Sequence, residues 1–258
     1  MRLNGKIILR GKGLHSGTEC TLTIEPCDAP CIMMNGQPIM ELALRGTGRG
    51  SDYIFPDGSC VRTCEHVLSA LAGLGFWAGV SLSVEGGEMP ALDGCSRTMC
   101  DALRANSEAG GDTQAFSLKE AMCVYGEDAS RFAAALPYEG FRVTYMVEYA
   151  FIGSQLFEYT GSYYEDISPA RTFAMQSDID YLRSHGMALG GSLDNAIVIG
   201  ETIQAKGGLR WPDEFVRHKV LDLIGDLAAV GRPINAHIIA AKAGHELHLK
   251  LADKLRGA

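Results

Sequence analysis

An imidazole and two carboxylates recur at four-residue intervals in the segment EFVRHKVLDLIGDL, residues 214–227. His218, Asp222 and Asp226 carry these groups, and Lys219 directly follows the histidine. Because an α-helix turns about 100° per residue, the four side chains share one polar arc, and the apolar residues between them cover the opposite face. Periodicity alone leaves two interpretations open, a solvated helix surface and a functional site.

Metal binding is one chemistry that this arc could perform. Histidine and aspartate at positions i and i+4 can bind the same ion. A catalytic zinc site needs a third protein ligand and an open position for water. His66 is a candidate for the third ligand because Glu65 precedes it at the start of an apolar helical segment. A glutamate beside a ligand is well placed to accept a proton from water.

Two other motifs could bind a metal, and both are weaker. The sequence HELH at 245–248 is one residue short of the zincin pattern H-E-x-x-H and has no third ligand nearby. Cys60, Cys64 and His66 could form half of a structural zinc site, but no second half is evident. We therefore favour neither.

The rest of the chain predicts an α+β protein. A polar, glycine-containing stretch, Asn106–Thr113, predicts a boundary between domains at 1–110 and 115–258. Residues 65–69 and 218–222 are weakly similar, which suggests two related units that face each other. Periodicity predicts helices over 64–75, 99–105, 175–186, 214–231 and 245–255, and strands over 21–26, 79–86, 121–126, 141–151, 195–200 and 234–244.

Composition limits the class of protein. The 258 residues carry a formal net charge of -8, which argues against a nucleic-acid partner. The sequence contains no apolar run that predicts a transmembrane segment, and Met1–Arg10 lacks the apolar core of a signal peptide. Eight cysteines without a C-x-x-C pair indicate free thiols in a reducing cytoplasm. The sequence leaves the oligomeric state open, with a monomer as our expectation.

Seven motifs in order resemble one enzyme family. They are GLHSG (13–17), TCEHVLSALAGLG (63–75), MPALDGCS (89–96), SPARTFAM (168–175), LGGSLDNAIV (189–198), DEFVRHKVLDLIGDL (213–227) and KAGHELHLKL (242–251). Together they resemble the UDP-3-O-acyl-N-acetylglucosamine deacetylases, the zinc amidases of lipid A synthesis in Gram-negative bacteria. The resemblance implies two α/β-sandwich domains packed against each other, with the active site in the cleft between them.

The resemblance also implies a role for individual residues. His66, His218 and Asp222 would bind Zn²⁺, with Fe²⁺ as an alternative in the cell. Glu65 would be the general base and His245 the general acid. The remaining roles are orientation of His245 by Asp226, oxyanion stabilisation by Thr172, contact with the sugar nucleotide by Lys219 and contact with the glucosamine ring by Phe173.

Acyl-chain binding is a further implication of the resemblance. The segment 174–199 would form an inserted β-α-β element that makes an apolar passage for the acyl chain of an acylated UDP-amino sugar. Its apolar side chains suit that use, although core packing explains them equally well. They are Met175, Ile179, Leu182, Met187, Leu189 and Leu193.

Two segments depart from the family pattern. Ala150-Phe151 replaces a common His-Pro pair, and Glu41–Arg62 is short for the family's inserted small sheet. These departures leave open a related zinc deacetylase that acts on another acetamido sugar. A binding protein without catalysis is disfavoured, because every implied catalytic position is filled.

Overall fold

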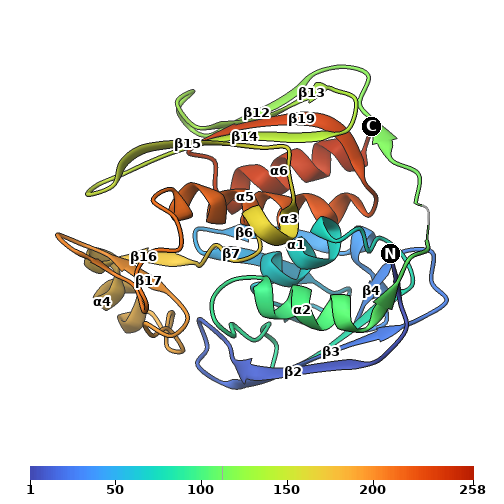
Figure 1. Cartoon of the computed structure of the whole chain (residues 1–258), viewed down its shortest axis with the longest axis horizontal. Coiled ribbons are helices and arrows are strands. Elements are labelled where there is room, and N and C mark those ends of the chain that lie inside the picture. The colour runs from blue at the N-terminus through green and yellow to red at the C-terminus, as the bar shows by residue number, and fades with distance from the viewer. Residues whose placement is uncertain (112) are drawn as a thin grey trace.

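The protein forms four layers in the computed structural model, which describes residues 1–111 and 113–258. Figure 1 shows a sheet on each outer side and two layers of helices between them. The inward faces of both sheets and helix pairs share one apolar core. The predicted α+β class is confirmed.

The first half builds one outer sheet and its helices. Its strand order is β2 (Ile7–Lys12), β3 (Glu19–Pro26), β9 (Val80–Glu85), β4 (Ile32–Met34) and β5 (Gln37–Pro38). Along β3, Cys20, Leu22 and Ile24 alternate inward, which is the period of a strand with one buried face. Helices α1 (Glu65–Gly73) and α2 (Arg97–Ala105) cover this face, and a short η1 (Ile39–Glu41) follows β5.

The second half repeats this plan. Its strand order is β12 (Met122–Tyr125), β13 (Phe132–Pro137), β19 (Ile234–Ala241), β14 (Phe141–Tyr149) and β15 (Gly153–Tyr159), with β11 (Phe116–Ser117) also paired to β19. The helices are α3 (Tyr163–Asp166), α5 (Glu214–Leu227), η2 (Ala228–Val230) and α6 (His245–Arg256). In the first sheet β9, which lies between α1 and α2 in the chain, pairs antiparallel with β3 and parallel with β4. In the second sheet β19, which lies between α5 and α6, pairs antiparallel with β13 and parallel with β14 and β11.

The two halves meet where α1 packs along α5. Gly225 makes this close approach feasible, because a Cβ atom there would lie 1.9 Å from the Glu65 carbonyl oxygen. Ser69 of α1 donates a hydrogen bond to the Leu221 carbonyl oxygen of α5 at 2.7 Å. The helix pair therefore brings the polar arc of α5 next to the first turn of α1.

Two additional small sheets flank this helix pair. The first is β6 (Ala43–Thr47), β7 (Gly50–Ile54) and β8 (Cys60–Val61), so the small sheet forms in spite of the short segment. The second consists of β16 (Phe173–Met175), β17 (Ile197–Ile199) and β18 (Ile203–Gln204). Helix α4 (Gln176–Ser184) connects β16 to β17. The predicted β-α-β element thus begins at Phe173, with β17 parallel to β16, and continues into β18.

The predicted boundary segment Asn106–Thr113 includes residue 112, which lies outside the described residues. Near it, β1 (Arg2–Leu3) pairs with β10 (Ser107–Glu108), while β11 already belongs to the second sheet. The division into two domains stays a prediction. Among the described residues, every helix falls short of the length and apolar character that crossing a bilayer would require.

Candidate metal centre and catalytic site

Three ligand atoms from the two halves converge on one point. The Nε2 atom of His218 lies 3.3 Å from Oδ1 of Asp222, and Nε2 of His66 lies 3.6 Å from the same oxygen. All three ligand atoms lie within 4.8 Å of one another. Within the described part of the chain, the buried Oδ1 atom of Asp222 has no hydrogen-bond partner. Two imidazoles beside an unpaired carboxylate oxygen form a donor set that fits a divalent cation.

The surroundings hold His218 in the form that binds a metal. Its Nδ1 atom lies 3.1 Å from the Ala170 carbonyl oxygen, so Nδ1 carries the proton and Nε2 keeps its lone pair. Burial lowers the pKa of His218 to about 3, which keeps the ring neutral. His218 therefore has the orientation and the tautomer that a metal ligand requires.

Asp222 is held as an anion. Burial acts to raise the pKa of its carboxyl group, but the positive charges of Lys219 and His245 outweigh burial and lower that pKa well below its usual range. The Nζ atom of Lys219 donates a hydrogen bond to Oδ2 at 2.7 Å. Because the lysine uses Oδ2, Oδ1 is left to face the two imidazoles.

Glu65 lies beside this point, at the first residue of α1. Its side chain is buried, and the Ser51 backbone N–H donates to Oε2 at 3.0 Å. Oε1 lies 4.0 Å from Nε2 of His245. Burial raises the pKa of Glu65, which makes its carboxylate a stronger base.

His245 enters from the other side, at the first residue of α6. Its Nδ1 atom contacts Oδ2 of Asp226 at 2.9 Å, and its Nε2 atom lies 3.7 Å from Oδ2 of Asp222. Burial acts to lower the pKa of His245, but Asp226 and Glu65 raise it to about 9. The imidazole is therefore cationic at neutral pH and can donate a proton.

Asp226 has two partners that sequence reasoning missed. His248 Nδ1 lies 2.8 Å from Asp226 Oδ2, and its Nε2 lies 2.8 Å from the Tyr145 hydroxyl oxygen. The Ser51 hydroxyl donates to Asp226 Oδ1. The only sequence signal was the three-residue spacing of His245 and His248, and Ser51 gave none.

Two other groups of three also bring ligand atoms together, Asp226–His245–His248 and Glu65–Asp222–His245. In the first group both oxygens of Asp226 already accept hydrogen bonds. The second requires His245, whose Nδ1 is bound by Asp226 and whose raised pKa favours the cation, a form that cannot bind a metal. The unpaired Oδ1 of Asp222 therefore favours the site with His66 and His218.

One cavity of about 370 Å³ is lined by nearly all of the site residues that the sequence predicted. Phe173 packs edge-on against His218, with ring centroids 5.9 Å apart, and Lys219 Nζ lies 5.4 Å from the Phe173 centroid. Asp226 alone among them does not line the cavity, since it lies behind His245. The others line it: Glu65, His66, Thr172, Phe173, His218, Lys219, Asp222 and His245.

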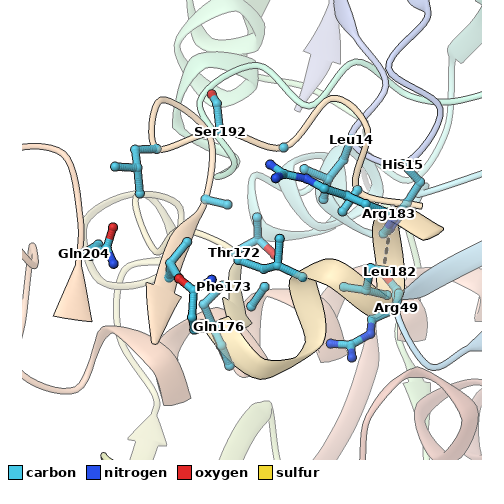
Figure 2. A pocket seen from close by; sticks show the side chains of 17 residues that line it. Leu14, His15, Arg49, Thr172, Phe173, Gln176, Leu182, Arg183, Ser192 and Gln204 are labelled. Atoms are coloured by element: carbon cyan, nitrogen blue, oxygen red, sulfur yellow. Dashed lines mark hydrogen bonds between the residues drawn. The ribbon is translucent and has the colours of Figure 1, made fainter. Parts of the chain in front are cut away.

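A second cavity, of about 270 Å³, adjoins the first within the inserted element (Figure 2). Ile179, Leu182 and Leu193 line it, as an apolar passage requires. Met175 lines the first cavity instead, and Leu189 is 54% exposed. Only part of the apolar set named from the sequence therefore faces this space.

Comparison with known proteins places the chain among the enzymes that the motifs resemble. The family profile described as UDP-3-O-acyl N-acetylglycosamine deacetylase (LpxC) matches residues 1–257. The chain belongs to this family. A UDP-3-O-acyl-N-acetylglucosamine deacetylase of Bdellovibrio bacteriovorus is 34% identical over 97% of this chain and 87% of its own length. A protein of the same name from Thermosynechococcus vestitus is 37% identical over 94% of this chain and 88% of its own length. Another, from Mannheimia succiniciproducens, is 36% identical over 98% of this chain and 88% of its own length.

The two departures from the deacetylase pattern replace none of the three candidate ligands. Phe151 is 66% exposed in the turn between β14 and β15, with a positive φ of 70°. The short segment Glu41–Arg62 still supplies Ser51 to the site. In this member of the deacetylase family, the three candidate ligands come together in spite of both departures.

Proposed function

We propose that this protein hydrolyses the N-acetyl group of UDP-3-O-acyl-N-acetylglucosamine, an early step of lipid A biosynthesis. Water adds to the acetamido carbonyl carbon, the C–N bond breaks, and acetate and the free amine leave. The observation that carries the proposal is the convergence of His66 and His218 on the unpaired Asp222 oxygen, with a base and an acid beside it. The identity of the substrate in this proposal is taken from the names of the related enzymes.

We further propose that His66, His218 and Asp222 hold Zn²⁺, or Fe²⁺ in the cell, because two imidazoles and one carboxylate suit either ion. When bound, such a cation acidifies water and polarises a carbonyl oxygen. Glu65 then accepts the proton of the attacking water. His245 donates a proton to the departing nitrogen, and Asp226 holds the imidazole through Nδ1.

Thr172 and Phe173 complete the reaction site. Thr172 is positioned by its backbone N–H, which donates to the Gly94 carbonyl oxygen at 2.8 Å, and its side chain lines the catalytic cavity. Its hydroxyl group would donate to the carbonyl oxygen as negative charge develops there. The Phe173 ring offers an apolar surface to the sugar.

Two neighbouring cavities support an acylated nucleotide sugar as substrate. The apolar cavity of the insert suits a hydrocarbon chain. A cavity of about 280 Å³ that shares Lys219 and His245 with the catalytic cavity is also lined by Arg131 and Lys242. These cations suit a diphosphate, although Lys242 pairs with Glu148 in the same cavity. The reacting group thus lies between sites for the two ends of the substrate.

Acetate release tests the proposal. The purified protein should release acetate from UDP-3-O-acyl-N-acetylglucosamine, contain a divalent metal, and lose both properties after treatment with a strong chelator. Activity that resists metal removal would contradict it. Equal kcat/KM on unacylated acetamido sugars would instead favour the second candidate, a zinc deacetylase of another sugar, which the altered residues at 150–151 leave open.

Compartment and assembly belong to the proposal as well. The eight free thiols suit a reducing cytoplasm. We expect a monomer, and sedimentation of the purified protein would test this.

A further inference from the structure

Arg49 lies where the catalytic cavity meets the apolar cavity, in the turn between β6 and β7. Its side chain lines both cavities, as do those of Leu14, Thr172, Phe173 and Ala174. Within this shared set Arg49 is the one charged residue. The mechanism above leaves it without a role.

The protein holds Arg49 at this junction from both ends. Its Nη2 atom donates to Oδ2 of Asp178 on α4 at 2.6 Å, and the two side chains are each 35% exposed. The Arg49 carbonyl oxygen contacts Nε2 of His15 at 3.2 Å, the dashed line in Figure 2. The Arg49 backbone N–H donates to Thr47 Oγ1 at 3.2 Å. The guanidinium is therefore fixed between the small sheet and the inserted element.

The guanidinium retains unused donors. Among the described residues, Nη2 alone has a hydrogen-bond acceptor in the protein, and Nε and Nη1 have none. A guanidinium offers five N–H donors in a planar arrangement, so pairing with Asp178 leaves most of them for a ligand. The neighbouring Thr172 is already assigned to the reacting carbonyl.

The chemistry of the proposed substrate places an acceptor at this point. The 3-O-acyl ester is attached to the sugar carbon next to the one that bears the acetamido group. With the acetamido group at the metal centre and the acyl chain in the apolar cavity, the ester must lie at the junction. We propose that Arg49 donates a hydrogen bond to the ester carbonyl oxygen and thereby determines the preference for acyl over alkyl substrates. This inference rests on the proposed function.

A substrate without the carbonyl acceptor tests the inference. A 3-O-alkyl ether of the same chain length keeps the hydrocarbon chain and removes the ester carbonyl. The wild-type protein should show a kcat/KM about tenfold higher for the ester than for the ether, the effect of one charge-assisted hydrogen bond in a half-exposed site. In Arg49→Met the ester-to-ether ratio should fall to about one, because the aliphatic stem remains and the donors are gone.

Arg183→Met is the matched control. Arg183 lines the apolar cavity but not the catalytic one. Its replacement should therefore change kcat/KM for the ester and for the ether by the same factor. The inference is overturned if the wild-type ester-to-ether ratio of kcat/KM is near one. It is also overturned if Arg49→Met leaves this ratio unchanged, even when overall activity falls.

The dissociation constants of both compounds are measured in parallel. If the protein binds them but releases no acetate from either, the proposed function fails. The ester-to-ether ratio of the dissociation constants then still decides the role of Arg49. If acetate release is normal and neither ratio responds to Arg49→Met, only the role of Arg49 fails.

Discussion

The two halves share a strand order and a helix arrangement but divide the chemistry unequally. In the first half α1 supplies one proposed metal ligand, His66, and the proposed base, Glu65. In the second half α5 supplies His218 and Asp222, and α6 supplies His245 from its first residue. The counterpart helix α2 supplies no side chain to the cavity, but Ser96 before it donates to the His66 carbonyl oxygen at 2.9 Å.

Equivalent positions show how the halves differ. In the weak repeat, Ser69 of α1 aligns with Asp222 of α5. Ser69 donates to the Leu221 carbonyl oxygen and accepts a hydrogen bond from the Tyr163 hydroxyl group at 2.7 Å, so it fixes helix packing. Asp222 instead presents an unpaired oxygen to two imidazoles. The same scaffold position serves packing in one half and faces the candidate metal site in the other.

The largest effect should come from removing a ligand. Asp222→Ala and His218→Ala are expected to lose metal and activity together, because two ligands hold a cation far less tightly than three. Metal content, measured by plasma mass spectrometry, checks this. Ser69→Ala, at the equivalent position of the other half, should keep a full complement of metal. Loss of metal in Ser69→Ala alone would contradict the assignment of roles.

Replacement of the base should separate catalysis from metal binding within α1. Glu65→Gln is expected to keep its metal and to lower kcat about 10²-fold or more, since only proton transfer is removed. Metal analysis and steady-state kinetics on the same sample test this. An empty site in Glu65→Gln would mean that a ligand has been mistaken for the base.

A change at the helix contact should affect both halves at once. Gly225→Ala places a Cβ atom 1.9 Å from the Glu65 carbonyl oxygen, so α1 and α5 must move apart. We expect a loss of about 2 kcal/mol in the free energy of unfolding, the usual range for overpacking. Thermal unfolding measures it. The control is Gly48→Ala, where the added Cβ meets open space, and equal destabilisation of both variants would count against the contact.

The smallest effect should come from the residue behind the acid. Asp226 raises the pKa of His245, so the cationic form persists up to a pH of about 9 and activity should fall above it. In Asp226→Asn the imidazolium loses its proton at lower pH, which moves the alkaline limb of the pH–rate profile to lower pH. We expect kcat at neutral pH to drop about tenfold, part of what a general acid contributes. An alkaline limb at the wild-type pH would exclude this pairing.

Local patterns predicted much of the fold. The alternation over 21–26 became the end of β3. The strand predicted over 234–244 became β19, which ends at Ala241, and the helix predicted over 214–231 became α5, which ends at Leu227 and continues as the short η2. The repeat of four residues also predicted that His218, Asp222 and Asp226 share one face. These successes have one cause, since strand and helix periods depend on neighbours along the chain.

Other contributions could not be predicted in this way. Ser51 and Arg49 belong to the turn and strand that follow β6, where glycines interrupt any period. His248 was visible as a spacing, but its bond to Asp226 depends on how α6 packs against α5. Each of these contacts joins residues that only folding brings together.

The sequence by itself determined the ligand types, their spacing on one helix and the family to which the chain belongs. The resemblance also predicted that His66 of one half meets His218 of the other, but spacing alone could not. Tertiary structure alone decided that Asp222 keeps an unpaired oxygen and that Arg49 lies between two cavities. The physical reason is that helical spacing fixes side chains only along one element. Burial, charge pairing and close helix contact fix them across elements that are distant in the chain.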